Sequence, residues 1–290
     1  MAPKWNNIFL QGFVGMGLVG YNTIKTLIDN YNADIYKDYA EFFPNLTLID
    51  NGRIENQCAR IFKKELSKRV FHFLNGPQPR GDEMTSFFLQ KIITDIAELN
   101  NAHKIDLFVS FGALVNKNLS YSDYQDISYD SKEDLAEKII ALEIEKDRKL
   151  YLATTGNPTF DDFVKDVGTV DEIVKETQGI INGLNGVLPA MVGERLKIPT
   201  VTIMIETTGT DVRTNNFPIL AQFLGLLATK KGLIFLERMF DLDIKLETKI
   251  DAILDELKAT AKQEIVNFFN KDYSAERSRE SEFRNDKMYT

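Results

Sequence analysis

The sequence predicts an α/β fold with a central, mainly parallel sheet that is flanked by helices. Along most of the 290 residues, segments of strand character alternate with segments of helical spacing, which is typical of this class. Several strand segments are apolar at consecutive positions, as expected for strands buried on both faces. No repeat and no long Pro/Gly/Ser linker divides the chain, so residues 1–270 are expected to form a single domain.

Six segments have strand character. The first, 7–13, is the short apolar run NIFLQGF, which ends at a glycine-rich turn. The most apolar is 104–114, and the richest in β-branched residues is 199–208. In chain order, the predicted strands are 7–13, 45–50, 69–76, 104–114, 149–156 and 199–208.

Helices are expected between and after these strands. The clearest spacing is that of Phe88, Ile92 and Ile96, which recur every fourth residue. In chain order, the predicted helices are 18–31, 83–101, 132–147, 187–196, 217–232 and roughly 246–270.

The last of these helices carries an apolar stripe, and the helical pattern ends after it. The stripe packs either on the helix's own domain or on another copy of the chain. Residues 272–287 mix five negative and four positive charges with few apolar groups, which predicts that 271–290 form a flexible tail. A coil of that length reaches about 25 Å. The stripe consists of Ile250, Ile253, Leu254, Leu257, Ala261, Ile265 and Phe268.

The amino-acid composition limits the classes of partner and the cellular compartment that we expect. A net charge of -8 argues against a nucleic-acid partner, because phosphate binding needs a basic face. The single cysteine, Cys58, cannot form an internal disulfide, which favours the reducing cytoplasm. No secretory signal is expected, and no apolar run reaches the roughly 20 residues of a membrane span.

Two glycine-rich segments are candidate ligand loops. Gly15, Gly17 and Gly20 have the G-x-G-x-x-G spacing of a dinucleotide-binding turn between a strand and a helix. The acid that would bind the ribose is poorly placed, because Asp50 follows about 30 residues later rather than about 20. The alternative is a tight turn that needs glycine for its backbone angles and for close packing.

The second segment has the same two interpretations. Gly183 and Gly186 precede a helix and could hold an anion at its N-terminus, or they could form a plain tight turn. Glu206 ends a buried strand, where open α/β sheets place their ligands. It could be a catalytic acid or a hydrogen-bond acceptor that holds a loop.

The usual signs of catalysis are missing from the sequence. His72 lies inside an apolar strand and is interpreted as a satisfied core residue, and His103 as a cation at a helix end. Neither histidine has a metal-ligand partner at a usable spacing, and Cys58 has no neighbouring histidine. No P-loop motif is present. We therefore expect no cofactor, no metal and no enzymatic activity.

Five segments together resemble the proteasome assembly chaperone family, especially its archaeal members. They are GFVGMGLVGYNTIKTLI, FHFLNGP, DLFVSFGAL, GIINGLNGVLPAMV and PTVTIMIETTG, in this order, within a likeness that runs from Ile8 to Gly232. The resemblance implies a sheet flanked by helices, similar to purine nucleoside phosphorylases, and a homo-oligomer. Relatives often carry an acidic residue and a proline soon after ETTG, whereas this chain reads TDVRTNNFP, which weakens a ligand site at that loop.

The last three residues complete the functional hypothesis. Met288, Tyr289 and Thr290 fit the hydrophobic-Tyr-X ending that is common in proteasome activators. By that resemblance, the terminal carboxylate pairs with a lysine between α-subunits of the core particle, while the tyrosine and methionine add contact area. The alternative is a frayed end of accidental composition.

The sequence thus predicts a cytoplasmic, ATP-independent proteasome assembly chaperone or activator that is a homo-oligomer. One alternative is a nucleotide- or nucleoside-binding enzyme of the phosphorylase or ATP-grasp kind. Another is an adaptor regulated by a small anion at the glycine loops.

Overall fold

The structure is a computed structural model, and most of the chain is described. The tail 271–290, and with it the predicted docking residues, lies outside the described residues. These are 5–15, 18–43, 47–50, 53–115, 124–146, 148–155, 163, 173–175, 183–207, 217–244 and 249–270.

Eight of the ten described strands form one sheet, in the order β2-β5-β6-β1-β7-β10-β8-β9. The strands are β1 (Asn7–Phe13), β2 (Asp34–Asp38), β3 (Thr47–Asp50), β4 (Arg53–Asn56), β5 (Arg60–Leu66), β6 (Arg69–Gly76), β7 (Leu107–Val115), β8 (Leu150–Thr155), β9 (Ile173–Lys175) and β10 (Thr200–Thr207).

The predicted parallel centre of the sheet is confirmed. Strand β1 runs parallel to both β6 and β7, with Ile8 opposite Phe71 on one side and Leu107 on the other, and β7 runs parallel to β10. These four strands are apolar on both faces because helices cover both sides.

Antiparallel strands flank this centre. The sequence predicted β8 as a strand but not its antiparallel direction, and it predicted neither β2 nor β5. Strands β5 and β6 form a hairpin, β2 pairs antiparallel with β5, and β8 pairs antiparallel with β10. The prediction that 45–50 joins the main sheet is wrong, because β3 pairs with β4 in a separate two-stranded sheet. Asp50 therefore does not end a strand beside β1, as a ribose-binding acid would.

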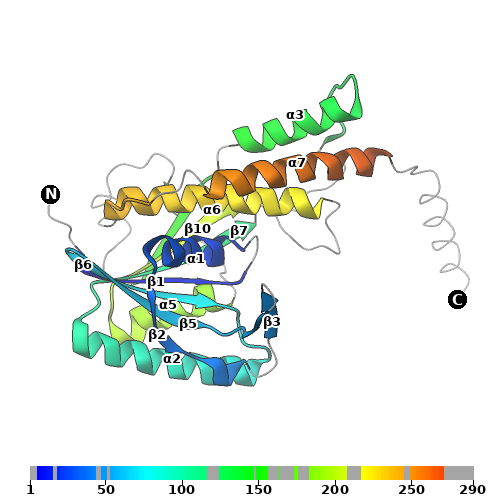
Figure 1. The fold of residues 1–290 in the computed structure, drawn as a ribbon. Helices are drawn as coiled ribbons and strands as arrows, with labels where there is room; N and C mark the ends of the chain where they lie inside the picture. The colour runs from blue at the N-terminus through cyan, green and yellow to red at the C-terminus, as the bar shows by residue number, and fades with distance from the viewer. Residues whose placement is uncertain are drawn as a thin grey trace, which may run out of the picture.

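Helices cover both faces of the sheet (Figure 1). They are α1 (Val19–Tyr31), α2 (Asp82–His103), α3 (Lys132–Glu145), α5 (Leu184–Leu196), α6 (Pro218–Phe240) and α7 (Lys249–Asn270), with a short 3-10 helix η2 (Ala40–Phe42).

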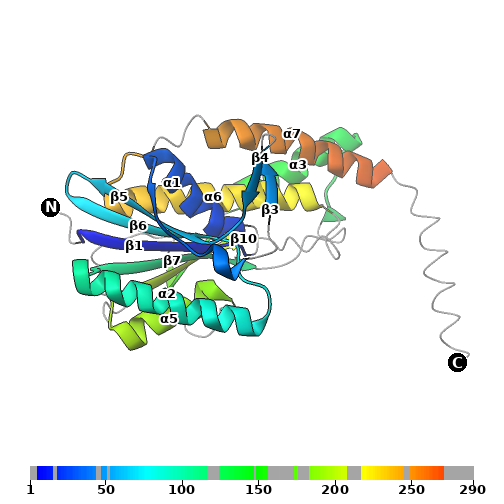
Figure 2. The same cartoon turned by 60° about the horizontal axis from the view of Figure 1, so that its bottom comes forward.

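The alternation of side chains along the strands creates two apolar cores. In β1, Ile8 and Leu10 face the core under α1 and α6, whereas Phe9 and Phe13 face the core under α2 and α5. Figure 2 shows α2 and α5 together on one side of the sheet and α6 on the other. The long helices therefore hold the sheet from both faces.

Helices α3 and α7 lie outside α6 and extend beyond the sheet (Figure 1). The predicted apolar stripe of α7 mainly packs within its own chain: Ile250, Leu254, Ala261 and Ile265 are buried in the core that α6 shares. The Glu264 carboxylate accepts hydrogen bonds from the first N–H groups of α6, 3.0 Å from the nitrogen of Ile219, and so ties the two helices together. Packing on its own domain is thus confirmed for most of the stripe.

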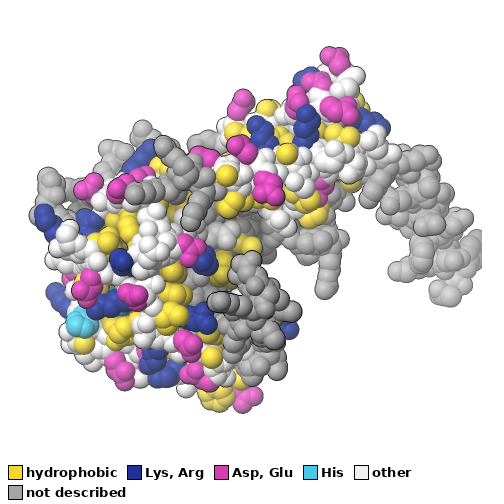
Figure 3. Space-filling view, in the orientation of Figure 1, with side chains coloured by type: hydrophobic (Ala, Val, Ile, Leu, Met, Phe, Trp, Pro, Cys, Tyr) yellow, Lys and Arg dark blue, Asp and Glu magenta, His cyan; other side chains and the backbone are white. Residues whose placement is uncertain are grey.

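The surface of this outer helical layer mixes both signs of charge (Figure 3). Lys262 of α7 pairs with Glu137 of α3, and Lys138 pairs with Asp134 at 2.7 Å within α3. Interspersed charges of this kind keep an extended helical surface solvated.

Helix α6 extends beyond the predicted helix 217–232 and is strongly apolar. Over the described residues, this 23-residue helix alone is long and apolar enough to cross a membrane, with a mean hydropathy of 1.6 over its most apolar window. However, 61% of that window is buried inside the protein, where α6 contacts α1, α7 and β10. An interior helix of a globular protein has the same composition.

Candidate functional site

The first glycine segment joins β1 to α1 by close packing. Gly20 lies in the first turn of α1, and a Cβ atom there would be 2.3 Å from the carbonyl oxygen of Phe111 in β7. Opposite it, a Cβ atom on Gly12 would be 2.1 Å from the carbonyl oxygen of Gly20. The glycines at these two positions let a helix touch the sheet backbone, which favours the packing interpretation over a ligand loop. Gly17 lies outside the described residues.

The second glycine segment begins α5, which starts one turn before the predicted boundary. Gly183 has a φ of 73°, a conformation that favours glycine, and Gly186 lies within the first turn of the helix. The Leu184 N–H is directed to Gln78 Oε1 at 3.4 Å, and Gln78 Nε2 also donates to the carbonyl oxygen of Val14 at 2.7 Å. Gln78 thus accepts the hydrogen bond that the Leu184 N–H, at the N-terminus of α5, could otherwise give to an anion.

The structure brings the two segments together through Asn185. Its Oδ1 accepts the N–H of Phe13 at 3.0 Å, and its Nδ2 lies 3.4 Å from the carbonyl oxygen of the same residue. Gly15 is adjacent, since a Cβ atom there would lie 3.5 Å from Asn185 Nδ2. The buried side-chain amide of Asn185 therefore contacts both backbone groups of Phe13 at the end of β1, as the backbone of a neighbouring strand would.

Two further polar side chains, from β1 and β7, hydrogen-bond to the start of α5. Gln11 Nε2 donates to the carbonyl oxygen of Leu184 at 2.9 Å, and Ser110 Oγ donates to that of Asn185 at 2.8 Å. Both side chains are fully buried. Sequence reasoning missed Gln11, Gln78, Ser110 and Asn185, and its only available signal was a polar residue within each of two apolar strands. Between the two glycine segments, protein groups therefore take the hydrogen-bonding positions that a ligand would use.

Glu206 acts as a hydrogen-bond acceptor, in agreement with the second of its two interpretations. Its Oε2 accepts the N–H of Lys149 at 3.2 Å, and its own N–H donates to the carbonyl oxygen of Lys149 at 3.0 Å. The contact joins the carboxyl end of β10 to the start of β8. The charged residues Asp211 and Arg213, which follow Glu206 in the sequence, lie outside the described residues.

The other reactive groups have structural surroundings. Cys58 is buried, and this burial raises the pKa of its thiol, which disfavours the nucleophilic thiolate. His103 is the last residue of α2, which is the helix-end position that the sequence predicted. Over the described part of the chain, no group of three metal-ligating side chains occurs.

His72 is buried, but the expectation that it is satisfied is wrong. Over the described residues, neither ring nitrogen has a hydrogen-bond partner. The ring stacks on Phe9 at a centroid distance of 6.2 Å and meets the edge of Tyr36 at 5.9 Å. Burial, with nearby Lys63 and His103, lowers its pKa to about 4. The imidazole is held neutral by an aromatic environment.

This pKa predicts an acid sensitivity that a single substitution removes. His72 is protonated near pH 6.5 in the unfolded chain, but only near pH 4 in the folded protein. The stability that the neutral His72 allows above pH 6.5 is therefore lost as the pH falls from 6.5 through 4. The loss from this residue alone should approach roughly 3 kcal/mol. His72→Phe, which keeps the ring contacts, should flatten this part of the pH dependence of the free energy of unfolding, measured by urea titration from pH 7.5 to 4. Parallel curves for parent and variant would contradict the assignment.

Comparisons with known proteins agree with this architecture. The model of the PAC2 family matches residues 9–264. No curated protein sequence matches the chain.

Three solved structures are similar over most of their length. PbaB of Pyrococcus furiosus, described as an archaeal proteasome activator, has a TM-score of 0.63 at 16% identity, covering 91% of this chain and 95% of PbaB. PbaA of the same organism, described as an archaeal homolog of proteasome-assembly chaperone, has 0.56 at 16% identity, covering 100% and 98%. A Mycobacterium tuberculosis proteasome-assembly chaperone homologue has 0.57 at 15% identity, covering 93% and 98%. At these identities the likeness shows the fold.

Proposed function

This chain belongs to the PAC2 family, and from that premise we propose that it is an ATP-independent assembly chaperone or activator of the proteasome. The observation that carries the proposal is the ending Met288-Tyr289-Thr290 on a chain of this family. The descriptions of PbaA, PbaB and the mycobacterial protein are consistent with such a role. Asn185 and Gln11 occupy the hydrogen-bonding positions between the two glycine segments, which disfavours a small-molecule substrate there.

We place the contact at the α-ring of the core particle. The Thr290 carboxylate would pair with a lysine between two α-subunits, and Tyr289 would supply a rigid amphipathic anchor. One such tail gives weak binding, in the high micromolar to millimolar range, after the cost of ordering the segment. A homo-oligomer with several tails can raise the affinity by roughly 10²–10⁴. The proposal therefore includes self-association of the chain. We also propose that the protein acts in the cytoplasm.

Removal of the ending should abolish binding to the core particle. We expect Tyr289→Ala, or deletion of 288–290, to reduce the response in surface plasmon resonance over immobilised core particle to background. Tyr273→Ala is the matched control, because it removes the same side chain from the same 20-residue segment without changing the last three residues.

Light scattering and circular dichroism on each variant separate docking from assembly. The tail variants should keep the mass and helix content of the parent, with a mass several times that of the 33.1 kDa chain. Undiminished binding after the deletion would show that any contact with the proteasome comes from residues 1–270 instead.

A further inference from the structure

A groove of about 570 Å³ separates α3 and α7, the two helices of the outer layer. The helices lie side by side and antiparallel, because Lys132 at the start of α3 bonds to Asn270 at the end of α7, whereas Glu137 pairs with Lys262 (Figure 1). The groove therefore has an outer end near Asn270 and an inner end where α3 stops over α6. Its small and apolar lining residues are Ile140, Ala141, Ile144 and Ala259.

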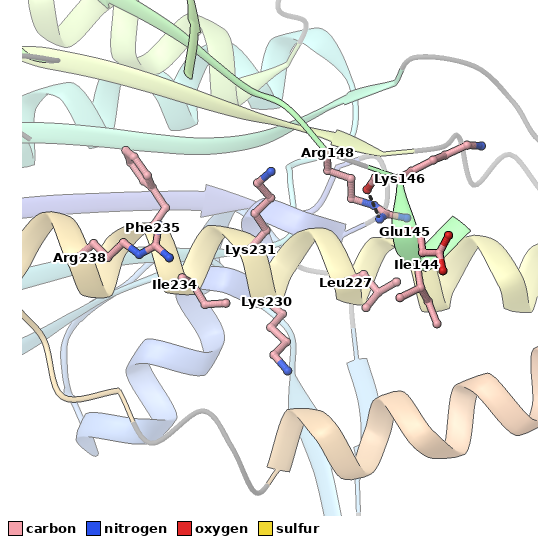
Figure 4. Close-up of a pocket in the computed structure, with 10 residues that line it drawn as sticks. All are labelled: Ile144, Glu145, Lys146, Arg148, Leu227, Lys230, Lys231, Ile234, Phe235 and Arg238. Carbon is pink, nitrogen blue, oxygen red and sulfur yellow. Dashed lines mark hydrogen bonds between the residues drawn. The ribbon is translucent and has the colours of Figure 1, made fainter. Parts of the chain in front are cut away.

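The apolar lining is exposed at the inner end of the groove. Ile140 is only 2% exposed, whereas Ile144, one turn further along α3, is 40% exposed. Ile144 and Glu145 also line a neighbouring pocket of about 430 Å³, which Figure 4 shows between the end of α3 and α6. Ala141 and Ala259 are exposed as well, and small side chains let another helix approach closely. An open groove with this lining fits a helix of a protein partner.

The charges at the two ends of the groove differ in their partners. At the outer end, Lys262 is already paired with Glu137 of the same chain. At the inner end, over the described residues, no ion pair engages Glu145, Asp255 or Lys258. All three side chains are exposed. Glu145 belongs to α3 and Lys258 to α7, so two opposite charges lie on opposite walls of the groove.

We propose that this face binds the same face of a second copy of the chain, about a two-fold axis that passes through the inner end of the groove. Rotation about that axis brings Lys258 of one copy to Glu145 of the other, and the same pair forms twice. A partner helix with charges of one sign would leave one wall without a counter-charge, which favours the self-contact. The contact rests on the self-association in the proposed function and assigns a surface to it.

The size of the face agrees with a specific dimer. Helices α3 and α7 have 14 and 22 residues, and are therefore about 21 and 33 Å long. Side by side they are about 20 Å wide. Specific interfaces bury about 800 Å² on each partner, and a face of these dimensions offers an area of that order.

Charge reversal in two separate chains tests the proposal. Lys258→Glu and Glu145→Lys each place like charges opposite each other twice per contact, which should raise the dissociation constant at least about 100-fold. In analytical ultracentrifugation, each variant alone should therefore sediment as a smaller species than the parent. An equimolar mixture of the two variants should regain the mass of the parent, because every glutamate then faces a lysine again.

Glu256→Lys is the matched control, because Glu256 is exposed on the same helix but is not part of the groove lining. It should keep the mass of the parent, and circular dichroism should give the same helix content for all variants. If the single variants keep the mass of the parent, or the mixture stays dissociated, the proposal is overturned and self-association uses another surface. A monomeric parent would overturn both this contact and the self-association in the proposed function, whereas docking is tested separately by the tail variants.

Discussion

A chain that ends one glycine beyond Thr290 should bind the proteasome core particle far more weakly than the parent chain. Under the proposed function, the terminal carboxylate pairs with a lysine, and the extra residue displaces that carboxylate by about 3.5 Å. A charge-assisted hydrogen bond contributes about 1.5–3 kcal/mol, so each tail should lose about 10- to 150-fold in affinity. Because several tails would act together, the loss for the oligomer should be larger still.

Replacement and extension separate the position of the carboxylate from the identity of the last residue. Thr290→Gly ends in the same glycine as the extended chain but keeps the original length, and it should bind almost as well as the parent. Surface plasmon resonance at two salt concentrations measures both variants, and higher salt should weaken binding by the parent through the same ion pair. Equal binding by the extended and parent chains would exclude the carboxylate from docking.

Substitution of Gly20 should lower the stability of the protein. Alanine normally favours a helix over glycine by about 1 kcal/mol, which alone would predict a gain. However, the new Cβ atom would lie 2.3 Å from the Phe111 carbonyl oxygen, so α1 must move away from the sheet. Overpacking of this kind costs about 1–3 kcal/mol and more when backbone is the obstacle. We expect Gly20→Ala to lower the free energy of unfolding by about 2 kcal/mol.

Gly15→Ala is the matched control for the same motif. Its Cβ atom would meet Asn185 Nδ2 at 3.5 Å, an ordinary contact, and the residue is exposed. The free energy of unfolding, measured by urea titration, should change by less than about 0.5 kcal/mol. If Gly15→Ala destabilised the protein as much as Gly20→Ala, close packing of α1 would not be the reason for the G-x-G-x-x-G spacing.

The sequence by itself determined the central strands and the long helices. Strands β1, β6, β7 and β10 are locally apolar, and α2 and α7 have a regular helical spacing, so a short window of residues is enough to recognise each one. It also determined the hydrophobic-Tyr-X ending, since a terminal motif is read directly from the chain. Family membership over residues 9–264 agrees with the resemblance carried by the ordered motifs.

Strand pairing was decided only by the tertiary structure. Strands β2 (DIYKD) and β5 (RIFKKEL) carry charged residues because they lie toward one edge of the sheet, and their local pattern resembles that of a loop. Strand β3 has strand character but pairs outside the main sheet, and β8 enters the sheet antiparallel. Strand pairing depends on contacts between residues that are distant in the sequence, and the periodicity of a short segment carries no information about them.

The same reason explains why the sites could not be read from the sequence. The hydrogen bonds between the two glycine segments join Gln11 to Leu184 and Asn185, which lie more than 170 positions away along the chain. A sequence shows which groups are available, but only the fold brings them within hydrogen-bonding or Coulombic distance, where burial and partners fix their chemistry.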